Sequence, residues 1–370
     1  MGVSANNHKV IVAMSGGVDS SVAALLLKEA GYDVVGVTLR MWVDPLSEVQ
    51  AGEEAKSCCS YEAVLDAQKV AALLDIPHYV LNMKDEFYEN VVCDFTSEYL
   101  RGRTPNPCVE CNRTVKFSFL LQKAKGLGIN RLATGHYARI EYDEISGSYK
   151  LYRGVDRQKD QSYMLYVLTQ EELRASLFPV GDKTKQEIRE IAERGKLKVA
   201  GKEESQEICF IPDNDYRSFM ERMCPEAARP GDIFSTSGEK LGRHQGIAFY
   251  TIGQRKGLGI TYSEPLYVID IDPSRNLVIV GTEPETYSSG VIVEKLNYIS
   301  GTAPAKPFKI EVKIRYRAPA VPATLYPPEN GHARVDFESK QKAVTPGQSA
   351  VFYDGDEVLG GGLINEPIKK

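Results

Sequence analysis

The feature that most constrains the fold is a short apolar run that leads at once into a glycine-containing loop and an amphipathic helix. Residues 9–14 (KVIVAM) are rich in β-branched side chains and predict a strand, and residues 21–30 place Val22, Leu25 and Ala30 on one helical face. Gly31 is positioned to cap that helix, and residues 33–39 (DVVGVTL) predict the next strand. Strand, helix and strand in this order predict a βαβ unit of a parallel sheet.

The pattern continues and then changes after residue 212. Further strands are expected at 78–83 and 131–135, with helices at 61–74 and 84–99, which predicts a doubly wound α/β domain reaching to about residue 210. Beyond it, short β-type runs alternate with Gly, Pro, Asp and Asn, and helical periodicity mostly vanishes. We therefore predict three domains: a catalytic α/β domain at 1–212, a small β-rich domain at 213–288 and a β-barrel-like domain at 289–370.

Composition restricts the class of protein. The chain has 370 residues, of which 42% are hydrophobic and 26% charged, as in a globular protein with two or three domains. No window approaches the roughly 18 apolar residues of a membrane span, and the first residues lack the apolar core of a signal peptide. We expect a cytoplasmic protein without a membrane partner. The net charge of −5 means that no global field draws it onto nucleic acid.

The loop Ser15-Gly16-Gly17-Val18-Asp19-Ser20 lies where a strand ends and a helix begins. Backbone N–H groups and the positive end of the helix dipole face an anion there, and the glycines allow phosphate to approach the backbone. The serine hydroxyls add donors, and Asp19 could help to hold Mg²⁺. No Walker lysine is present, which argues against an ordinary ATPase or kinase. The alternative is a glycine-rich turn that binds nothing.

Two cysteine-containing segments suggest thiol chemistry. Residues 104–113 (TPNPCVECNR) form a proline-stiffened loop in which Cys111, near a helix start and close in sequence to Arg113 and Lys116, is expected to have a lowered pKa. About a hundred residues later, 204–210 (ESQEICF) presents Cys209, so two loops could face one another. A C-x-x-C alone also fits half a zinc site or a thioredoxin-like pair. The remaining cysteines are interpreted as structural or incidental: Cys58, Cys59, Cys93 and Cys224.

Together these motifs carry a family resemblance. SGGVDS resembles the pyrophosphate loop of the N-type ATP pyrophosphatases, which split ATP between the α and β phosphates and adenylate a substrate oxygen. With ATGHYAR at 133–139 and ESQEICFIP at 204–212, the chain is similar to the tRNA-specific 2-thiouridylase family. The similarity covers essentially the whole chain and also includes the segments 159–163, 250–259, 315–316 and 346–348.

The resemblance implies a two-stage reaction. ATP with Mg²⁺ adenylates the C2 oxygen of the wobble uridine in tRNA, and sulfur then displaces AMP to leave 2-thiouridine. Cys209 resembles the residue that takes a persulfide from a sulfur-donor protein. Cys111 resembles the nucleophile that forms a transient disulfide with Cys209 as sulfur is released.

The resemblance also implies a set of binding residues. ATP is expected at Ala13, Met14, Ser15, Gly16, Gly17, Val18, Asp19, Ser20, Met41 and Gly135. The target base is expected near Asn106, Pro107 and Cys108. Other tRNA contacts are expected at His136, Lys159, Asp160, Gln161, Arg315, Tyr316 and Gln348. For His136 the alternative is a satisfied histidine at a strand end.

Cys108 departs from the family pattern. Many members carry Asp at this position, so the role of that carboxylate in proton transfer does not transfer to a thiol. The change also offers three thiols, Cys108, Cys111 and Cys209, that could ligate a [4Fe–4S] cluster with one open iron position. The persulfide and disulfide route needs only Cys111 and Cys209, so both hypotheses stay open.

Two basic segments are candidates for contact with the tRNA backbone. Residues 183–202 contain seven basic and three acidic residues, and 306–317 contain five and one. In the second segment, charged and apolar residues alternate, so a strand would gather the charges from Lys309 to Arg317 on one face. The alternative is a solvated edge that discourages aggregation.

Two other functions fit parts of the sequence. An adenylating ligase or amidotransferase of the same superfamily would share the phosphate loop but has no use for the placed thiols. A metal- or RNA-binding module without catalysis would use the cysteines as zinc ligands but has no need of the loop. Production of AMP together with thiolated uridine distinguishes the thiouridylase from both.

Overall fold

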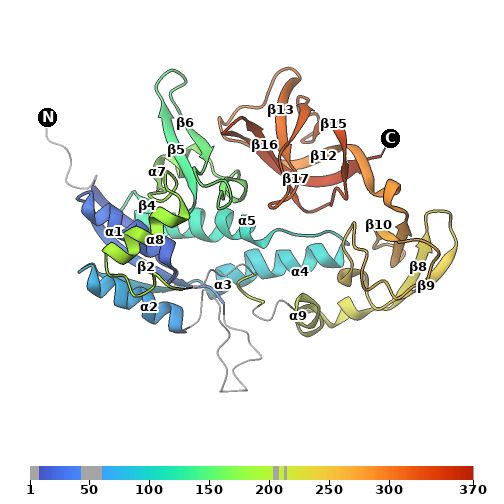
Figure 1. Ribbon diagram of the computed structural model, residues 1–370, viewed down its shortest axis with the longest axis horizontal. Helices are drawn as coiled ribbons and strands as arrows, with labels where there is room; N and C mark the ends of the chain where they lie inside the picture. Colours follow the sequence, from blue (N-terminus) through green and yellow to red (C-terminus); the bar gives the residue numbers. More distant parts are fainter. Residues whose placement is uncertain (1–7, 43–60, 203–207, 212–214, 370) are drawn as a thin grey trace.

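The computed structural model describes residues 8–42, 61–202, 208–211 and 215–369. Figure 1 shows an α/β region at the N-terminal end, a small β region at the opposite end and a C-terminal barrel beside the helices that join them. The predicted fold class, a parallel-sheet domain followed by β-rich units, is confirmed.

The α/β region is built on a five-stranded parallel sheet in the order β3-β2-β1-β4-β7. Its strands are β1 Lys9–Ala13, β2 Asp33–Arg40, β3 His78–Asn82, β4 Leu132–Ala133 and β7 Ser176–Leu177. The helices α1 Val18–Glu29, α2 Tyr61–Leu73 and α8 Lys185–Arg194 pack on it, and a core that includes Val10, Val22 and Ile188 is fully buried between these layers. The strands and helices predicted for this region are therefore confirmed, with ends shifted by a few residues.

Two long helices depart from regular α geometry. The first runs through α3 Lys84–Phe87, η3 Tyr88–Val92 and α4 Cys93–Leu100, and the second through α5 Pro107–Cys111, η4 Asn112–Phe119 and α6 Leu120–Gly126. The middle section of each is a π-helix, a form that is rare and often found at functional sites. The second π-helix begins directly after Cys111.

The small β region contains β8 Gly231–Ser235, β9 Lys240–His244, β10 Tyr267–Asp272 and β11 Leu277–Gly281, in the order β10-β11-β8-β9. It follows α9 Tyr216–Met223, a helix that the change of texture after residue 212 did not predict. Short 3₁₀ turns complete this part at η6 Pro225–Ala228, η7 Ile247–Phe249 and η8 Glu283–Thr286.

Six antiparallel strands form the C-terminal barrel. They are β12 Tyr287–Tyr298, β13 Phe308–Lys313, β14 Val321–Leu325, β15 Ala333–Lys342, β16 Ser349–Asp354 and β17 Glu357–Ile368. The order β12-β15-β14-β13-β16-β17 closes through an additional pairing of β12 with β17. Val293, Val335 and Phe352 are fully buried inside, which follows from the alternation of apolar residues along the strands.

A hairpin from the α/β region extends the barrel sheet. Strands β5 Ala138–Asp143 and β6 Ser148–Arg153 pair with each other, and β6 then pairs with β17 through Tyr152 opposite Glu357 and Leu151 opposite Val358. The 3₁₀ turn η5 Ser162–Met164 and helix α7 Gln170–Ala175 follow the hairpin. Strand pairing therefore crosses the expected boundary between the first and last domains, and the boundaries at 212 and 288 stay a prediction.

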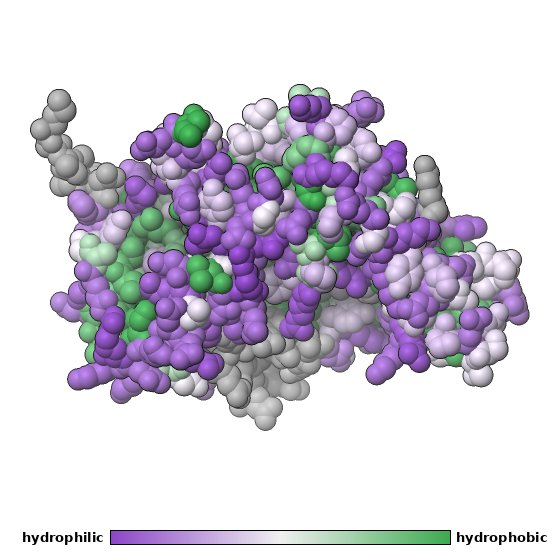
Figure 2. Space-filling model, turned by 45° about the horizontal axis from the view of Figure 1, so that its top comes forward, coloured by the Kyte–Doolittle hydropathy of each residue, from purple (hydrophilic) through white to green (hydrophobic). Residues whose placement is uncertain are grey.

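The outer surface is mainly polar. Hydrophilic residues cover most of the face shown in Figure 2. Within the described residues, no helix combines the length and apolar character needed to cross a membrane.

Candidate active site

The phosphate loop is held open at the start of α1. Gly17 is the N-cap, and no side chain caps the helix there, so the first backbone N–H groups of α1 are available to an anion. The hydroxyls of Ser20 and Ser21 donate to the Gly17 carbonyl oxygen at 3.2 and 2.8 Å. The serines thus shape the loop, and they leave phosphate binding mainly to the backbone.

Glycine is required at two close approaches around this loop. Gly16 has φ of +70°, and a Cβ there would lie 2.2 Å from the carbonyl oxygen of Ala63 on α2. A Cβ on Gly135, which follows β4, would lie 2.6 Å from the backbone nitrogen of Ser20. Met41 directly follows β2. The residues predicted to bind ATP therefore gather at the carboxyl ends of β1, β2 and β4, where ligands bind in open parallel sheets.

A buried lysine from a distant part of the chain reaches the loop. The Nζ atom of Lys185, the first residue of α8, lies 2.7 and 2.9 Å from the two carboxylate oxygens of Asp19. The Tyr137 hydroxyl donates to Asp19 Oδ1 at 2.6 Å. The Lys185 side chain is only 10% exposed, so its positive charge is held beside the Asp19 carboxylate.

A second lysine approaches from the other side. Lys202 Nζ lies 3.3 Å from the Gly16 carbonyl oxygen and 2.9 Å from Asp66 Oδ2. The hydrogen bond from Lys202 lowers the pKa of Asp66. Although the loop contains no lysine of its own, two lysines lie beside it. Both lysines belong to the basic segment 183–202, which the sequence suggested as a contact for tRNA. Their pairing with the loop could not be predicted because they lie far from it along the chain.

The proline-stiffened segment becomes helical earlier than expected, because α5 begins at Pro107 and contains Cys108 and Cys111, which were expected on a loop. Asn106 is the N-cap and accepts from the Val109 N–H at 3.4 Å, and Pro107 occupies the first helical turn. Cys108 is therefore the thiol closest to the helix N-terminus, and it is exposed, whereas Cys111 lies one turn further on and is buried. Desolvation by the surrounding protein raises the pKa of Cys108, and the charge of Lys116 offsets this only in part.

Cys111 contacts a residue at the carboxyl end of the parallel sheet. Its Sγ atom lies 3.9 Å from Sδ of Met41, the residue expected to contact ATP. Arg113, which was expected to influence this thiol, pairs with Glu110 at the surface. The position of Cys111 therefore links α5 to the end of β2 through Met41.

Cys209 lies on a turn against the same core. It is half-buried, and it packs with Cys111 against one hydrophobic cluster. Among residues 8–42, 61–202, 208–211 and 215–369, no group of three or more Cys, His, Asp and Glu side chains is placed to hold a metal ion. Cys108, Cys111 and Cys209 thus do not form the ligand set that a [4Fe–4S] cluster needs, and the geometry gives this hypothesis no support.

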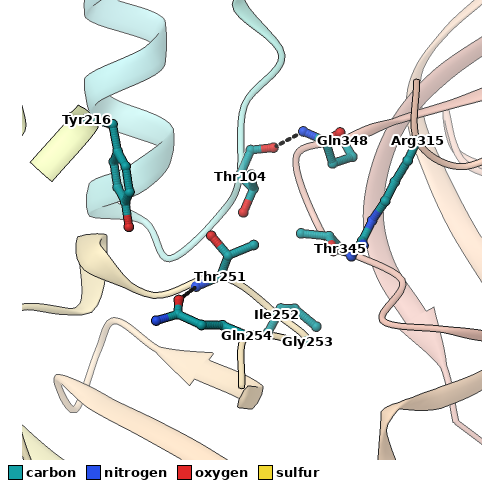
Figure 3. Close-up of a pocket in the computed structure, with 9 residues that line it drawn as sticks. All are labelled: Thr104, Tyr216, Thr251, Ile252, Gly253, Gln254, Arg315, Thr345 and Gln348. Carbon is teal, nitrogen blue, oxygen red and sulfur yellow. Dashed lines mark hydrogen bonds between the residues drawn. The ribbon is translucent and has the colours of Figure 1, made fainter. Parts of the chain in front are cut away.

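A pocket of about 500 Å³ lies where the three parts of the chain meet, away from the phosphate loop (Figure 3). Gln348 donates through Nε2 to the carbonyl oxygens of Thr104 and Pro105 at 3.0 and 3.1 Å, which ties the barrel to the cysteine loop. Arg315 donates to Thr345 Oγ1 at 2.6 Å on the barrel side. The pocket is lined by Thr104, Tyr216, Thr251, Ile252, Gly253, Gln254, Arg315, Thr345 and Gln348.

Comparison with known proteins identifies the family. The model of the tRNA methyl transferase HUP domain matches residues 8–213, that of the tRNA methyl transferase PRC-barrel domain matches 217–282, and that of the aminomethyltransferase beta-barrel domain matches 288–364. The tRNA-specific 2-thiouridylase MnmA 1 of Caldanaerobacter subterraneus is 52% identical over 98% of this chain and 99% of its own. The MnmA proteins of Carboxydothermus hydrogenoformans and Clostridium perfringens are 52% and 51% identical, over 97% and 96% of this chain and 98% of their own.

The chain belongs to the MnmA family of tRNA-specific 2-thiouridylases. Among solved structures, an NMN synthetase from Francisella tularensis aligns with 59% of this chain and 77% of its own, at 16% identity and a TM-score of 0.34, which is too low to support a conclusion.

Several residues expected to touch tRNA in this MnmA family member face inward. His136 is 8% exposed, and its Nδ1 lies 2.7 Å from Thr134 Oγ1. Burial and then the charge of Lys116 lower the pKa of His136 well below its ordinary value, so the ring is neutral. Asp160 is buried and accepts from the Gly154 N–H at 3.1 Å. The contacts of His136 fit the alternative of a satisfied histidine, and those of Asp160 are internal to the fold.

Gln161 and Lys159 continue that segment. The Gln161 side chain accepts from the Tyr137 N–H at 3.0 Å, which connects it to the tyrosine that holds Asp19. Lys159 is half-buried, and its backbone N–H donates to the Asp156 carbonyl oxygen at 3.1 Å. The segment thus packs behind the phosphate loop in this structure.

The barrel's basic segment is only partly a strand. β13 ends at Lys313, so Arg315 and Arg317 lie beyond it, although Ile310, Val312 and Ile314 are buried as predicted. Lys313 lies over the rings of Tyr163 and Tyr316, and burial lowers its pKa. The expected row of charges is therefore broken. Cys58, Cys59 and residues 204–207 lie outside the described residues.

Proposed function

We propose that this protein is an ATP-dependent tRNA-uridine 2-sulfurtransferase that converts the wobble uridine of tRNA to 2-thiouridine. One observation carries the proposal: Met41, directly after the carboxyl end of β2, contacts Cys111 on α5 with 3.9 Å between the two sulfur atoms. Since β2 neighbours β1, whose carboxyl end leads into the phosphate loop, this contact supports a thiol and a nucleotide at the same edge of the sheet. The family membership supports the same reaction.

In the first stage, the loop binds the phosphates of ATP. The backbone N–H groups at the start of α1 receive the phosphates, and Lys185 and Lys202 supply the positive charge that the loop lacks. Asp19 would hold Mg²⁺ once the ion displaced Lys185 from its carboxylate, and the ion would then neutralise phosphate charge during transfer. The uridine C2 oxygen attacks the α-phosphorus, and pyrophosphate leaves.

In the second stage, sulfur is delivered from Cys209. A sulfur-donor protein leaves a persulfide on Cys209, and the Cys111 sulfur attacks the Cys209 Sγ atom. The bond between Sγ and the outer sulfur breaks, and the Cys111 proton passes to the leaving sulfide. Sulfide then attacks C2, and AMP leaves with the oxygen. A thiol reductant returns the Cys111–Cys209 disulfide to two thiols.

Cys108 is assigned a place beside the target base, together with Asn106 and Pro107. Its raised pKa keeps the thiol protonated near neutral pH, so it can donate a hydrogen bond but does not replace a carboxylate base. The other proposed tRNA contacts are His136, Lys159, Asp160, Gln161, Arg315, Tyr316 and Gln348. Because several of these face inward here, their contact with tRNA requires rearrangement on binding. A cytoplasmic location is proposed from the need to meet tRNA.

The reaction is tested by incubating the protein with ATP, Mg²⁺, a persulfide donor and unmodified tRNA, and then measuring AMP and 2-thiouridine. Both products are expected in a ratio near one. Cys209→Ser is expected to lose thiouridine, whereas Cys93→Ser, at an exposed thiol with no proposed role, is expected to keep it. AMP without thiouridine would instead indicate an adenylating ligase.

Sulfur transfer by cysteine alone is tested separately. Anaerobically purified protein is assayed for iron and acid-labile sulfide, with Cys108→Ala as the comparison. Full thiolation by iron-free protein is the expected result. A brown protein whose iron is lost in Cys108→Ala would establish the cluster route.

A further inference from the structure

The turn that carries Cys209 is mounted on a cluster of aromatic rings. This aromatic cluster consists of Trp42, Phe87, Phe95, Phe210 and Phe219. Phe210 is 1% exposed, and its ring centroid lies 5.2 Å from Phe95, 5.3 Å from Phe219, 5.6 Å from Phe87 and 6.1 Å from Trp42. Phe210 therefore contacts every other member of the cluster.

The backbone transmits this anchoring to Cys209. The Ile211 N–H donates to the Ile208 carbonyl oxygen at 2.9 Å, which closes a four-residue turn with Cys209 in its second position. Phe210 and Ile211 are both buried, whereas Cys209 is half-buried. The Cα atoms of Cys209 and Phe210 are one peptide apart, about 3.8 Å. Displacement of the Phe210 ring therefore displaces the thiol.

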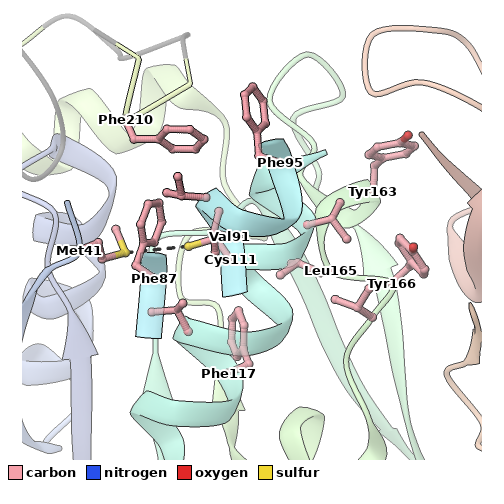
Figure 4. Packing of buried hydrophobic residues seen from close by; sticks show 14 of the residues in the cluster. Met41, Phe87, Val91, Phe95, Cys111, Phe117, Tyr163, Leu165, Tyr166 and Phe210 are labelled. Atoms are coloured by element: carbon pink, nitrogen blue, oxygen red, sulfur yellow. Dashed lines mark hydrogen bonds between the residues drawn. The ribbon is translucent and has the colours of Figure 1, made fainter. Parts of the chain in front are cut away.

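The same cluster holds the segments around Cys111. Trp42 follows Met41, whose sulfur touches Cys111, and Figure 4 shows this contact in the same buried cluster as Phe87, Phe95 and Phe210. Phe219 comes from α9, so the small β region also contributes a ring. The aromatic cluster thus connects the Cys209 turn with the strand end that contacts Cys111.

We infer that Phe210 is a positioning residue that sets the effective concentration of the Cys209 sulfur toward Cys111. This inference rests on the proposed function, because a persulfide on Cys209 is useful only if Cys111 reaches the Cys209 Sγ atom. The physical quantity itself is measurable without tRNA. Two thiols and oxidised glutathione exchange to one protein disulfide and two reduced glutathiones, so every electron is accounted for.

The test is a glutathione equilibrium on the full-length protein, with the Cys111–Cys209 cross-linked peptide quantified by mass spectrometry. Phe210→Leu is expected to lower the effective concentration at least about tenfold, because misplacement of about 1 Å can cost reacting groups up to a hundredfold. Phe95→Leu is the matched control. It removes a ring that touches Phe210 but leaves Phe210 itself beside Cys209 and in contact with its three other rings, so its effect is expected to be smaller and to stay within about threefold.

Two further readouts separate positioning from folding. Trp42 is the only tryptophan, so its emission reports whether the aromatic cluster remains packed in each variant. If Phe210→Leu opens the cluster, Phe210→Met, which keeps an apolar side chain of similar volume, takes its place and is expected to give an intermediate value. Equal effects of the Phe210 and Phe95 substitutions, or no effect of the former, would overturn the inference. A wild-type protein that forms the disulfide but no thiouridine would instead refute the proposed function.

Discussion

Gly135→Ala is expected to damage ATP use by a steric effect that can be worked out from the backbone. The new Cβ would lie 2.6 Å from the Ser20 nitrogen and 2.7 Å from the Asp19 carbonyl carbon. These are backbone atoms in the first turn of α1, so no side chain can rotate away. To reach an ordinary contact of 3.4 Å, the β4 end and α1 must separate by about 0.8 Å.

That displacement acts on the N–H groups proposed to receive phosphate. Overpacking of this size costs roughly 1–3 kcal/mol of folding stability. Since a shift near 1 Å can cost up to a hundredfold, kcat/KM for tRNA-dependent AMP formation is expected to fall about 10- to 100-fold. The thermal stabilisation by ATP, which depends on the ratio of ligand concentration to Kd, is expected to shrink as well.

The assay compares AMP formation and the ATP-induced rise in Tm for wild type, Gly135→Ala and Gly126→Ala. Gly126 ends α6, and a Cβ there would have no neighbour within 4 Å, so this variant is expected to behave like wild type. If Gly135→Ala retains wild-type KM for ATP and the full Tm shift, the proposed position of the phosphates is refuted.

The remaining predictions concern a charge, a proton and an interdomain contact. Lys185→Met removes the cation from Asp19 and is expected to lower the free energy of unfolding in urea by about 2–3 kcal/mol, less than for a fully buried pair because the Asp19 side chain is 28% exposed. The control Lys183→Met, beside the exposed Asp182, should cost under about 0.5 kcal/mol, and equal costs for the two variants would contradict the argument. The lowered pKa of His136 means that the unfolded chain binds its proton more readily, so stability is lost as pH falls below 6.5, by up to about 1.4 kcal/mol per pH unit. His136→Gln should therefore show a shallower loss between pH 6.5 and 5.5, where the half-buried His78 and the buried His244 still contribute. An unchanged slope would show that the folded protein protonates His136 as readily as the unfolded chain does. Gln348→Ala breaks the two hydrogen bonds to the cysteine loop and should lower thiouridine formation more than AMP formation. Gln341→Ala, whose side-chain amide donates to Ser339 on its own strand, serves as the control. Equal losses of thiouridine and AMP in Gln348→Ala would count against a role for this contact in sulfur transfer.

Local patterns predicted the local structure well. The β-branched run, the glycine loop and the helical face around Val22 depend on neighbouring residues, and the structure contains each of them where expected. The start of the cysteine helix was missed: residues 104–113 were expected as a loop, although Asn106 and Pro107 are short-range signals for a helix start. The closed barrel followed from the change to short alternating runs.

What sequence could not predict depends on contacts between distant segments. Lys185 lies 166 positions from Asp19, so its charge looked like part of an outward basic patch. Arg315 turns into the pocket because β13 ends at Lys313, and periodicity alone does not locate that end. The π-helical section that begins after Cys111 was also missed, because the sequence there has the pattern of an ordinary amphipathic helix.

The hairpin of β5 and β6 has a consequence for biogenesis. Its outer edge pairs with β17, which is about 200 residues further along the chain, and Lys150 and Arg153 reach acidic partners at Glu357 and Glu311. During synthesis that edge stays unpaired until the last strand leaves the ribosome, and an unpaired strand edge is prone to self-association. Truncation before β17 should therefore yield an aggregating fragment instead of a working ATP-binding half, which makes arrival of the C-terminus the step that completes the N-terminal region.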